Sequence, residues 1–182
     1  LWNIMGNTIE LGDEFMKKGI IGILILTMLL CGCSSKLEDG VLLLEDGQYE
    51  EAIETFEAQI EKEKQLDEAY RGIAIANYEL GNYEEAVVNF EKALENEAKE
   101  TVAMYHLMAS ACMKYEDYEN AMKYYDIVLG MEDCTEEVKK EILFNKIAIY
   151  EKAADWESAK EAVDTYLESY PDDERVIKEA EF

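Results

Sequence analysis

The side chains best suited to catalysis or metal binding are scarce in this sequence. His106 is the only histidine, and no cysteine or aspartate stands at a fixed offset from it that would make a catalytic pair or a metal site. The 42 acidic residues are spread so widely that no pair of carboxylates is distinctive. The sequence has no calcium-binding or phosphate-binding loop pattern. We therefore expect a protein that is not an enzyme and that holds no metal and no cofactor.

Cysteine chemistry is the next candidate, and the 4 cysteines fall into two pairs. Cys112 occupies a helical position that requires a buried apolar side chain, so we interpret it as a small core residue. Cys134 lies in a loop and would then be a partly exposed free thiol. A disulfide between these two is the alternative in an oxidising compartment. Cys31 and Cys33 instead follow the apolar run at 19–30.

Residues 16–33 read MKKGIIGILILTMLLCGC. A charged start, an apolar run and a cysteine follow one another here in the order found in a secretion signal. Lys17 and Lys18 form a positively charged start. The apolar run that follows, at 19–30, is shorter than the roughly 20 residues that a membrane-spanning helix needs. A short apolar run behind a positive start is typical of a signal peptide, and a non-cleaved anchor is the alternative.

The cysteines that end this run resemble the lipobox of bacterial lipoproteins. In that motif a small residue precedes the cysteine that is diacylated on sulfur before cleavage. Gly32 directly precedes Cys33, and Leu30 stands three positions before it, as the motif requires. Cys31 follows the bulky Leu30 and does not fit. The resemblance implies lipidation at Cys33, and two acyl chains bury enough methylene groups for stable anchoring. A plain secretory signal is the alternative.

This interpretation divides the chain into four segments. Residues 1–15 carry acidic side chains that are unlike a signal, so we interpret them as a non-native upstream extension before a start at Met16. The signal peptide then covers 16–32, a short tether covers 33–36, and one helical domain covers 37–182.

The charge of the chain is strongly negative, with 17 basic residues and a formal net charge of −25. Nucleic-acid binders need cationic surface to displace counterions from phosphate, so we exclude that class. Acidic surface is typical of a solvated face that keeps a protein soluble, and attraction to a cationic partner is the alternative.

One hexapeptide recurs along the chain as GQYEEA, GNYEEA, EDYENA and ADWESA. An aromatic residue precedes each closing alanine by three positions, and a large side chain follows it by four. This pattern predicts pairs of helices that approach closely at the alanine, while the aromatic and large residues fill the gap between units. The alanines are Ala52, Ala86, Ala121 and Ala159, spaced by 34, 35 and 38 residues; the aromatics are Tyr49, Tyr83, Tyr118 and Trp156; the large residues are Phe56, Phe90, Tyr125 and Val163.

The period of 34 and the spacing from alanine to phenylalanine resemble the tetratricopeptide repeat. Part of the upstream pattern is present as Tyr70-x₂-Ile73-Ala74, with an equivalent stretch in the next repeat, and Pro171 stands where the family places its proline. The resemblance implies an all-α, right-handed superhelical solenoid of about four hairpins with a C-terminal capping helix. The repeats would cover about 33–66, 67–101, 102–135 and 140–173.

Glycines and apolar periodicity predict the helix boundaries within these repeats. Gly47 and Gly81 can adopt the left-handed conformation that ends a helix, whereas Glu116 and Ala154 make the equivalent turns less ideal. Helices are expected at about 36–46, 49–63, 67–80, 83–97, 101–115, 118–130, 135–153, 156–170 and 172–181.

The resemblance also implies a ligand groove, because the first helix of each pair lines the concave face in this family. Such a mixed surface suits an extended peptide or an amphipathic helix. Packing between repeats is the alternative role for any of its members. The groove residues carried over are Arg71, Ile75 and Tyr78 from the second repeat, His106, Ser110 and Met113 from the third, and Phe144, Ala148 and Glu151 from the fourth.

We therefore expect a protein- or peptide-binding adaptor in the bacterial cell envelope. Its N-terminal diacylglycerol would anchor it to the extracytoplasmic face of the membrane. An assembly factor for outer-membrane protein insertion or pilus biogenesis is one alternative. A lipoprotein that binds a small ligand or a cation is another, although no dedicated site for either is visible in the sequence.

Overall fold

The computed structural model describes residues 35–177, and this part of the chain forms nine helices and no strands. Within it, no helix combines the length and the apolar composition needed to cross a membrane. The predicted signal peptide, the predicted lipidation site Cys33 and residues 178–182 lie outside the described residues. The helices are α2 (Ser35–Glu45), α3 (Tyr49–Ile60), α4 (Leu66–Glu79), α5 (Tyr83–Glu95), α6 (Val102–Lys114), α7 (Tyr118–Leu129), α8 (Glu136–Lys152), α9 (Trp156–Ser169) and α10 (Glu174–Ile177).

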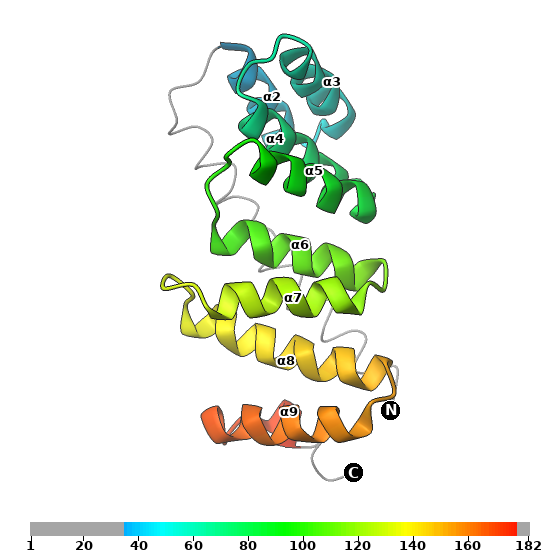
Figure 1. The fold of residues 1–182 in the computed structure, drawn as a ribbon, viewed down its shortest axis with the longest axis vertical. Helices are drawn as coiled ribbons and strands as arrows, with labels where there is room; N and C mark the ends of the chain where they lie inside the picture. The colour runs from blue at the N-terminus through cyan, green and yellow to red at the C-terminus, as the bar shows by residue number, and fades with distance from the viewer. Residues whose placement is uncertain (1–34, 178–182) are drawn as a thin grey trace.

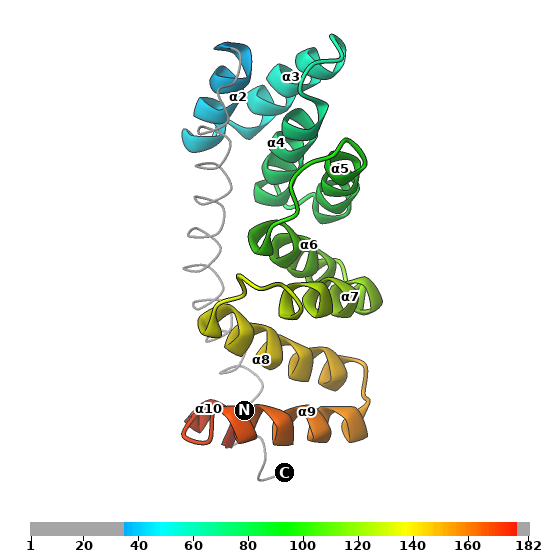
Figure 2. The same cartoon turned by 60° about the vertical axis from the view of Figure 1, so that its left-hand side comes forward.

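Successive helices pair into hairpins that stack along the long axis of the molecule (Figure 1). The pairs are α2–α3, α4–α5, α6–α7 and α8–α9, and α10 follows at the C-terminal end. Figure 2 shows α2, α4 and α6 on one side of the stack and their partners α3, α5 and α7 on the other. The all-α solenoid of four hairpins with a terminal helix, predicted from the repeat, is therefore confirmed.

From α2 to α9, helix ends agree with the predicted boundaries to within three residues. α2 already begins at Ser35, so the helix includes part of the segment expected to be a tether. The last helix begins at Glu174 rather than at 172. It starts there because Asp173 caps it: Oδ1 of Asp173 accepts a hydrogen bond of 3.1 Å from the backbone N–H of Arg175.

Small residues let the two helices of each hairpin approach each other closely. The four repeated alanines are all buried, and the large side chains four residues later are buried beside them. This confirms the packing role that the spacing predicted for both sets. The exposed fractions are 0% for Ala52, Ala86 and Ala121, 6% for Ala159, 0% for Phe56 and Phe90, 1% for Tyr125 and 7% for Val163.

The ring of Phe56 shows how tight this packing is. A Cβ atom at Gly40 in α2 would lie 2.6 Å from the ring, and a Cβ atom at Gly72 in α4 would lie 2.4 Å from it. Both distances are far shorter than a van der Waals contact, so the ring fills the space that the two absent side chains leave. One side chain of α3 therefore joins the first repeat to the second.

The aromatic residue that opens each second helix follows the prediction in three repeats and departs from it in the fourth. Tyr49, Tyr83 and Tyr118 are partly buried, and the hydroxyl of Tyr49 donates a 3.2 Å hydrogen bond to Glu79 of the next repeat. Trp156 is instead 65% exposed. The expectation that it fills a gap between units is wrong, because no further hairpin follows α9 in the described residues.

The buried apolar side chains form two clusters. The larger cluster runs from Leu37 in α2 to Ile149 in α8. The smaller cluster joins α8, α9 and α10 and includes Tyr166 and Val176. Val176 is 0% exposed, as expected for a residue that covers the end of the stack. α8 contributes to both clusters, with Ile142 and Ile149 in the larger one and Ile147 in the smaller one.

The turn inside each hairpin repeats one hydrogen-bond pattern. The backbone N–H that follows the turn residue donates to the carbonyl five positions earlier, at 2.8–2.9 Å in all four hairpins. The turn residue has a positive φ, which glycine adopts freely and other residues adopt only at a cost. Two repeats use glycine there and two do not. The φ values are 74° at Gly47, 81° at Gly81, 66° at Glu116 and 55° at Ala154.

Exchanging glycine and alanine at two of these turns should change stability in opposite directions. At Gly81 a Cβ would have no neighbour within 4 Å, so Gly81→Ala tests backbone strain alone. We expect it to lower the free energy of unfolding by about 1 kcal/mol. Ala154→Gly relieves the same strain and should raise that free energy by about 1 kcal/mol. Urea unfolding measures both changes, and a stabilising Gly81→Ala would contradict the left-handed turn.

Asp173 holds α10 against the preceding hairpin. Its side chain is 6% exposed and lies 2.9 Å from Nζ of Lys140 and 2.8 Å from Nη2 of Arg175. The hydroxyl of Tyr166 donates a hydrogen bond of 2.8 Å to Oδ2 of Asp173. Hydrogen bonds from Arg175 first, and then from Lys140 and Tyr166, hold the pKa of Asp173 far below its usual value of 3.8.

Asp173→Asn should therefore destabilise the protein in a pH-dependent way. At pH 7 we expect the free energy of unfolding to fall by about 2 kcal/mol, because charge-assisted hydrogen bonds are lost. The folded-state pKa lies below the unfolded one, so the carboxylate stabilises the fold fully above a pH of about 4 and progressively less below it. Urea unfolding of wild type and variant should give a stability gap that narrows as pH falls below about 4. A gap that does not change with pH would refute the ionic role.

Candidate functional site

Equivalent positions of α2, α4, α6 and α8 form three rows. Residues four and seven positions apart lie on one face of a helix, and the repeat spacing of 34, 35 and 38 residues carries that face from hairpin to hairpin. We call these twelve residues the even-helix face, and they include all nine residues predicted for the groove. The rows are Leu37, Arg71, His106 and Phe144; Val41, Ile75, Ser110 and Ala148; and Leu44, Tyr78, Met113 and Glu151.

Burial divides the nine predicted groove residues into two groups. Five of them, on α4 and α6, are buried. The four towards the C-terminal end are half-buried. The role of any of them in binding stays a prediction. The exposed fractions are 6% for Arg71, 0% for Ile75, 5% for Tyr78, 2% for His106 and 6% for Ser110; the half-buried residues are Met113, Phe144, Ala148 and Glu151.

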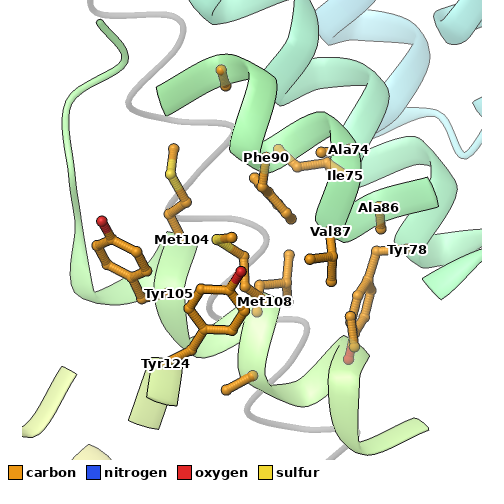
Figure 3. Close-up of a cluster of buried hydrophobic side chains, with 14 of the residues drawn as sticks. Ala74, Ile75, Tyr78, Ala86, Val87, Phe90, Met104, Tyr105, Met108 and Tyr124 are labelled. Atoms are coloured by element: carbon orange, nitrogen blue, oxygen red, sulfur yellow. The ribbon is translucent and has the colours of Figure 1, made fainter. Parts of the chain in front are cut away.

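Contacts between repeats explain part of this burial. Ile75 belongs to the buried cluster in which Phe90 and Met108 also lie (Figure 3). The hydroxyl groups of Tyr78 on α4 and Ser110 on α6 are 2.9 Å apart and share a hydrogen bond. Packing between repeats, which the sequence left open as the alternative, is therefore seen for these residues.

Three buried polar groups of this layer are not satisfied by hydrogen bonds from the described residues. They are Nε of Arg71, both ring nitrogens of His106, and Oε2 of Glu141 on α8. Nε2 of His106 lies 3.5 Å from Oε2 of Glu141, which is the limit of hydrogen-bond distance, and the contact is an ion pair only when His106 is protonated. A buried polar atom without a partner costs about 1–3 kcal/mol, so such atoms mark a place where a ligand can bind favourably.

The α8 end of the face is built differently. The ring of Phe144 packs with Tyr166 at 6.4 Å between ring centroids, and the guanidinium of Arg175 lies 5.0 Å from the Phe144 centroid. Partial burial raises the pKa of the Glu151 carboxyl. Phe144 is therefore tied to the C-terminal cluster, while the residues on α4 and α6 are tied to the larger one.

The two cysteines in the described part of the chain are both free thiols. Cys112 is 0% exposed, and this burial raises its pKa to about 11, which keeps it an unreactive thiol. Its interpretation as a core residue is confirmed. Cys134 is partly exposed, and burial raises its pKa as well. The disulfide alternative is not what the structure shows.

A surface hollow between α3, α4 and α5 was not anticipated from the sequence. Its volume is about 520 Å³, and its lining includes Glu57, Glu85 and Lys92. The Nζ atom of Lys92 lies 5.6 Å above the ring centroid of Tyr70 at this hollow. No residue of the even-helix face lines this hollow. Its lining comes from both helix layers, so only an analysis of the two layers together could have located it from the sequence.

Comparison with known protein families gives two matches along the stack. The family model of the tetratricopeptide repeat matches residues 43–110, and a second model of the same repeat matches residues 102–132. The matches run from the end of α2 through α7 and leave the fourth hairpin outside. A comparison with curated proteins finds no match. Tetratricopeptide repeats bind protein partners and are in general non-catalytic scaffolds. The chain therefore contains tetratricopeptide repeats, a module of protein–protein interaction.

Proposed function

We propose that this protein is a lipid-anchored adaptor of the bacterial cell envelope, which binds a protein or peptide on the even-helix face. The observation that carries the binding part is the set of buried polar atoms at Arg71, His106 and Glu141, which have no hydrogen-bond partner among the described residues. They come from three successive first helices, and the same layer is otherwise mostly apolar.

The chemistry of this surface favours a peptide over a small polar molecule. Its rows supply apolar contacts from α2 to α8, and the unsatisfied groups supply a few polar contacts of both signs. Peptide sites combine apolar anchors with a small number of placed polar groups in this way. A bound segment that pairs with the guanidinium and the imidazole would remove the cost of leaving them buried and unpaired.

The anchoring part of the proposal rests on the N-terminal sequence and on where α2 begins. If Cys33 carries the lipid, only Ser34 separates it from the first residue of α2. Such a short connection would hold the first hairpin against the head groups. The strongly negative charge of the chain would be repelled by anionic lipids, which favours a stack that points away from the membrane.

Palmitate labelling tests the anchor. In cells that express the full chain, we expect label to be incorporated in wild type, lost in Cys33→Ala and kept in Cys31→Ala, because only Cys33 has a small residue directly before it. Gel autoradiography of the immunoprecipitated protein measures the result. Label that persists in Cys33→Ala would refute the assignment.

A crosslinking pull-down from intact cells tests the binding surface. The double change Met113→Glu and Ala148→Glu places charge on half-buried positions of the even-helix face, so capture of partners should fall about tenfold or more. Val88→Glu is the matched control, because Val88 lies on α5 in the other layer and is 42% exposed. Far-UV circular dichroism should show that both variants are folded. Equal recovery of partners from both variants would rule out this surface.

A further inference from the structure

The hollow between α3, α4 and α5 is a second surface, separate from the even-helix face. α4 packs against both α3 and α5, whereas α3 and α5 have no comparable contact with each other. Figure 2 shows α3 and α5 on the same side of the stack, with α4 beside them. The gap between α3 and α5 therefore forms a groove along α4, and its volume of about 520 Å³ lies within the range of ligand sites.

The less exposed part of the lining is mostly apolar. Ile53 and Ile60 on α3 line the hollow together with Ile73 and the ring of Tyr70 on α4. Ile53 and Ile60 stand seven positions apart, which is about two turns, so both lie on one face of α3. Both isoleucines and Tyr70 are half-buried. A partner's apolar side chain would therefore remove exposed apolar surface from water at this place.

The more exposed part of the lining is negatively charged. Glu57 and Glu61 lie on the α3 side and Glu85 lies on α5, and all three are exposed. None of the three carboxylates takes part in an ion pair among the described residues. Glu57 and Glu61 are four positions apart, where like charges destabilise a helix. A positively charged ligand would relieve this repulsion.

The lining's one cation does not neutralise these carboxylates. Nζ of Lys92 lies 5.6 Å above the ring centroid of Tyr70, and Lys92 forms no ion pair among the described residues. Three carboxylates against one ammonium leave the rim negative, which disfavours anionic ligands. Within the described part of the chain, no three acidic, histidine or cysteine side chains are grouped to hold a metal ion. The rim therefore suits separate positive groups rather than one bare ion.

We propose that this hollow binds a short segment of a partner protein in which lysine or arginine flanks an apolar side chain. The apolar side chain packs against Ile53 and Ile60, and the basic side chains pair with Glu57 on one wall and Glu85 on the other. The site does not depend on the even-helix face, because no residue of that face lines it.

The dimensions of the groove set the length of the segment. The lining residues of α3 begin at Ile53 and end at Glu61, which corresponds to about 12 Å along the helix axis. An extended peptide advances about 3.3 Å per residue, so three or four residues fill the groove. Asn89 on α5 also lines it, and its Nδ2 donates a 2.8 Å hydrogen bond to the carbonyl of Glu85. Its Oδ1 can accept a backbone N–H of the bound segment.

Fluorescence polarisation with synthetic peptides tests this proposal on protein purified from cells that express the full chain. Each labelled peptide has eight residues, with arginine, one varied residue and arginine at its centre and glycine and serine around them. We expect saturable binding when the varied residue is leucine. Binding should be at least about tenfold weaker with glycine there, because the apolar contact is lost. Glutamate in place of both arginines should abolish binding.

Two double variants with the same loss of charge locate the peptide. Glu57→Gln with Glu85→Gln removes both pairing carboxylates and should weaken binding of the leucine peptide about tenfold or more. Glu54→Gln with Glu84→Gln is the matched control, because it removes two exposed carboxylates from the same two helices outside the hollow. Its affinity should stay close to that of wild type, since exposed charges outside the contact are largely screened.

Three results would overturn the proposal. They are the absence of saturable binding by the leucine peptide, equal affinity of the leucine and glycine peptides, and equal affinity of the two double variants. A peptide that binds the Glu57→Gln, Glu85→Gln protein normally but is lost in Met113→Glu with Ala148→Glu lies on the even-helix face. That outcome also rules out the hollow as its site and leaves the proposed function standing.

Discussion

The contact between the Phe56 ring and the backbone at Gly40 and Gly72 is the constraint on which the stack depends. Neither glycine could carry even a methyl group without moving the ring. The same requirement recurs in weaker form at each repeated alanine, where a larger side chain would push the two helices of a hairpin apart. The first helix of one repeat, α2, and the first helix of the next, α4, both contact this ring. The ring therefore fixes the position of the second hairpin relative to the first.

This constraint explains why so much of the fold could be predicted from the sequence. Small and large residues at fixed spacing can be recognised in the amino-acid sequence. Their packing partners lie within the same repeat or the next one. Helix ends followed from the turn residues for the same reason. Trp156 was misjudged because its environment depends on the end of the stack, which a repeating pattern does not describe. The burial of the predicted groove residues on α4 and α6 could not be predicted either, because position within a repeat does not give the exposed fraction of a side chain.

The residues that hold the fold together differ from those that the proposed function assigns to partner binding. The residues that repeat are those that fix helix against helix, such as Ala86 and Phe90. Arg71, His106 and Glu141 do not repeat, and each has a buried polar atom without a hydrogen bond among the described residues, as Gln59 on α3 also does. A folding argument therefore does not account for them, because apolar residues at those positions would avoid the desolvation cost. The proposed function accounts for these three residues as groups that pair with a bound partner.

The division of the core into two clusters has a consequence for cooperativity. In a linear array each hairpin is stabilised by its immediate neighbours, so a boundary between clusters is a boundary between units that open separately. The smaller cluster, which joins α9, α10 and Ile147 of α8, forms one such unit, and the larger cluster, which includes Ile142 and Ile149 of α8, forms the other. Unfolding of the whole chain then departs from a two-state transition, and a single Tm would average two events. Opening of the C-terminal unit would leave the buried part of the even-helix face folded, so partner binding and global melting report on different parts of the molecule.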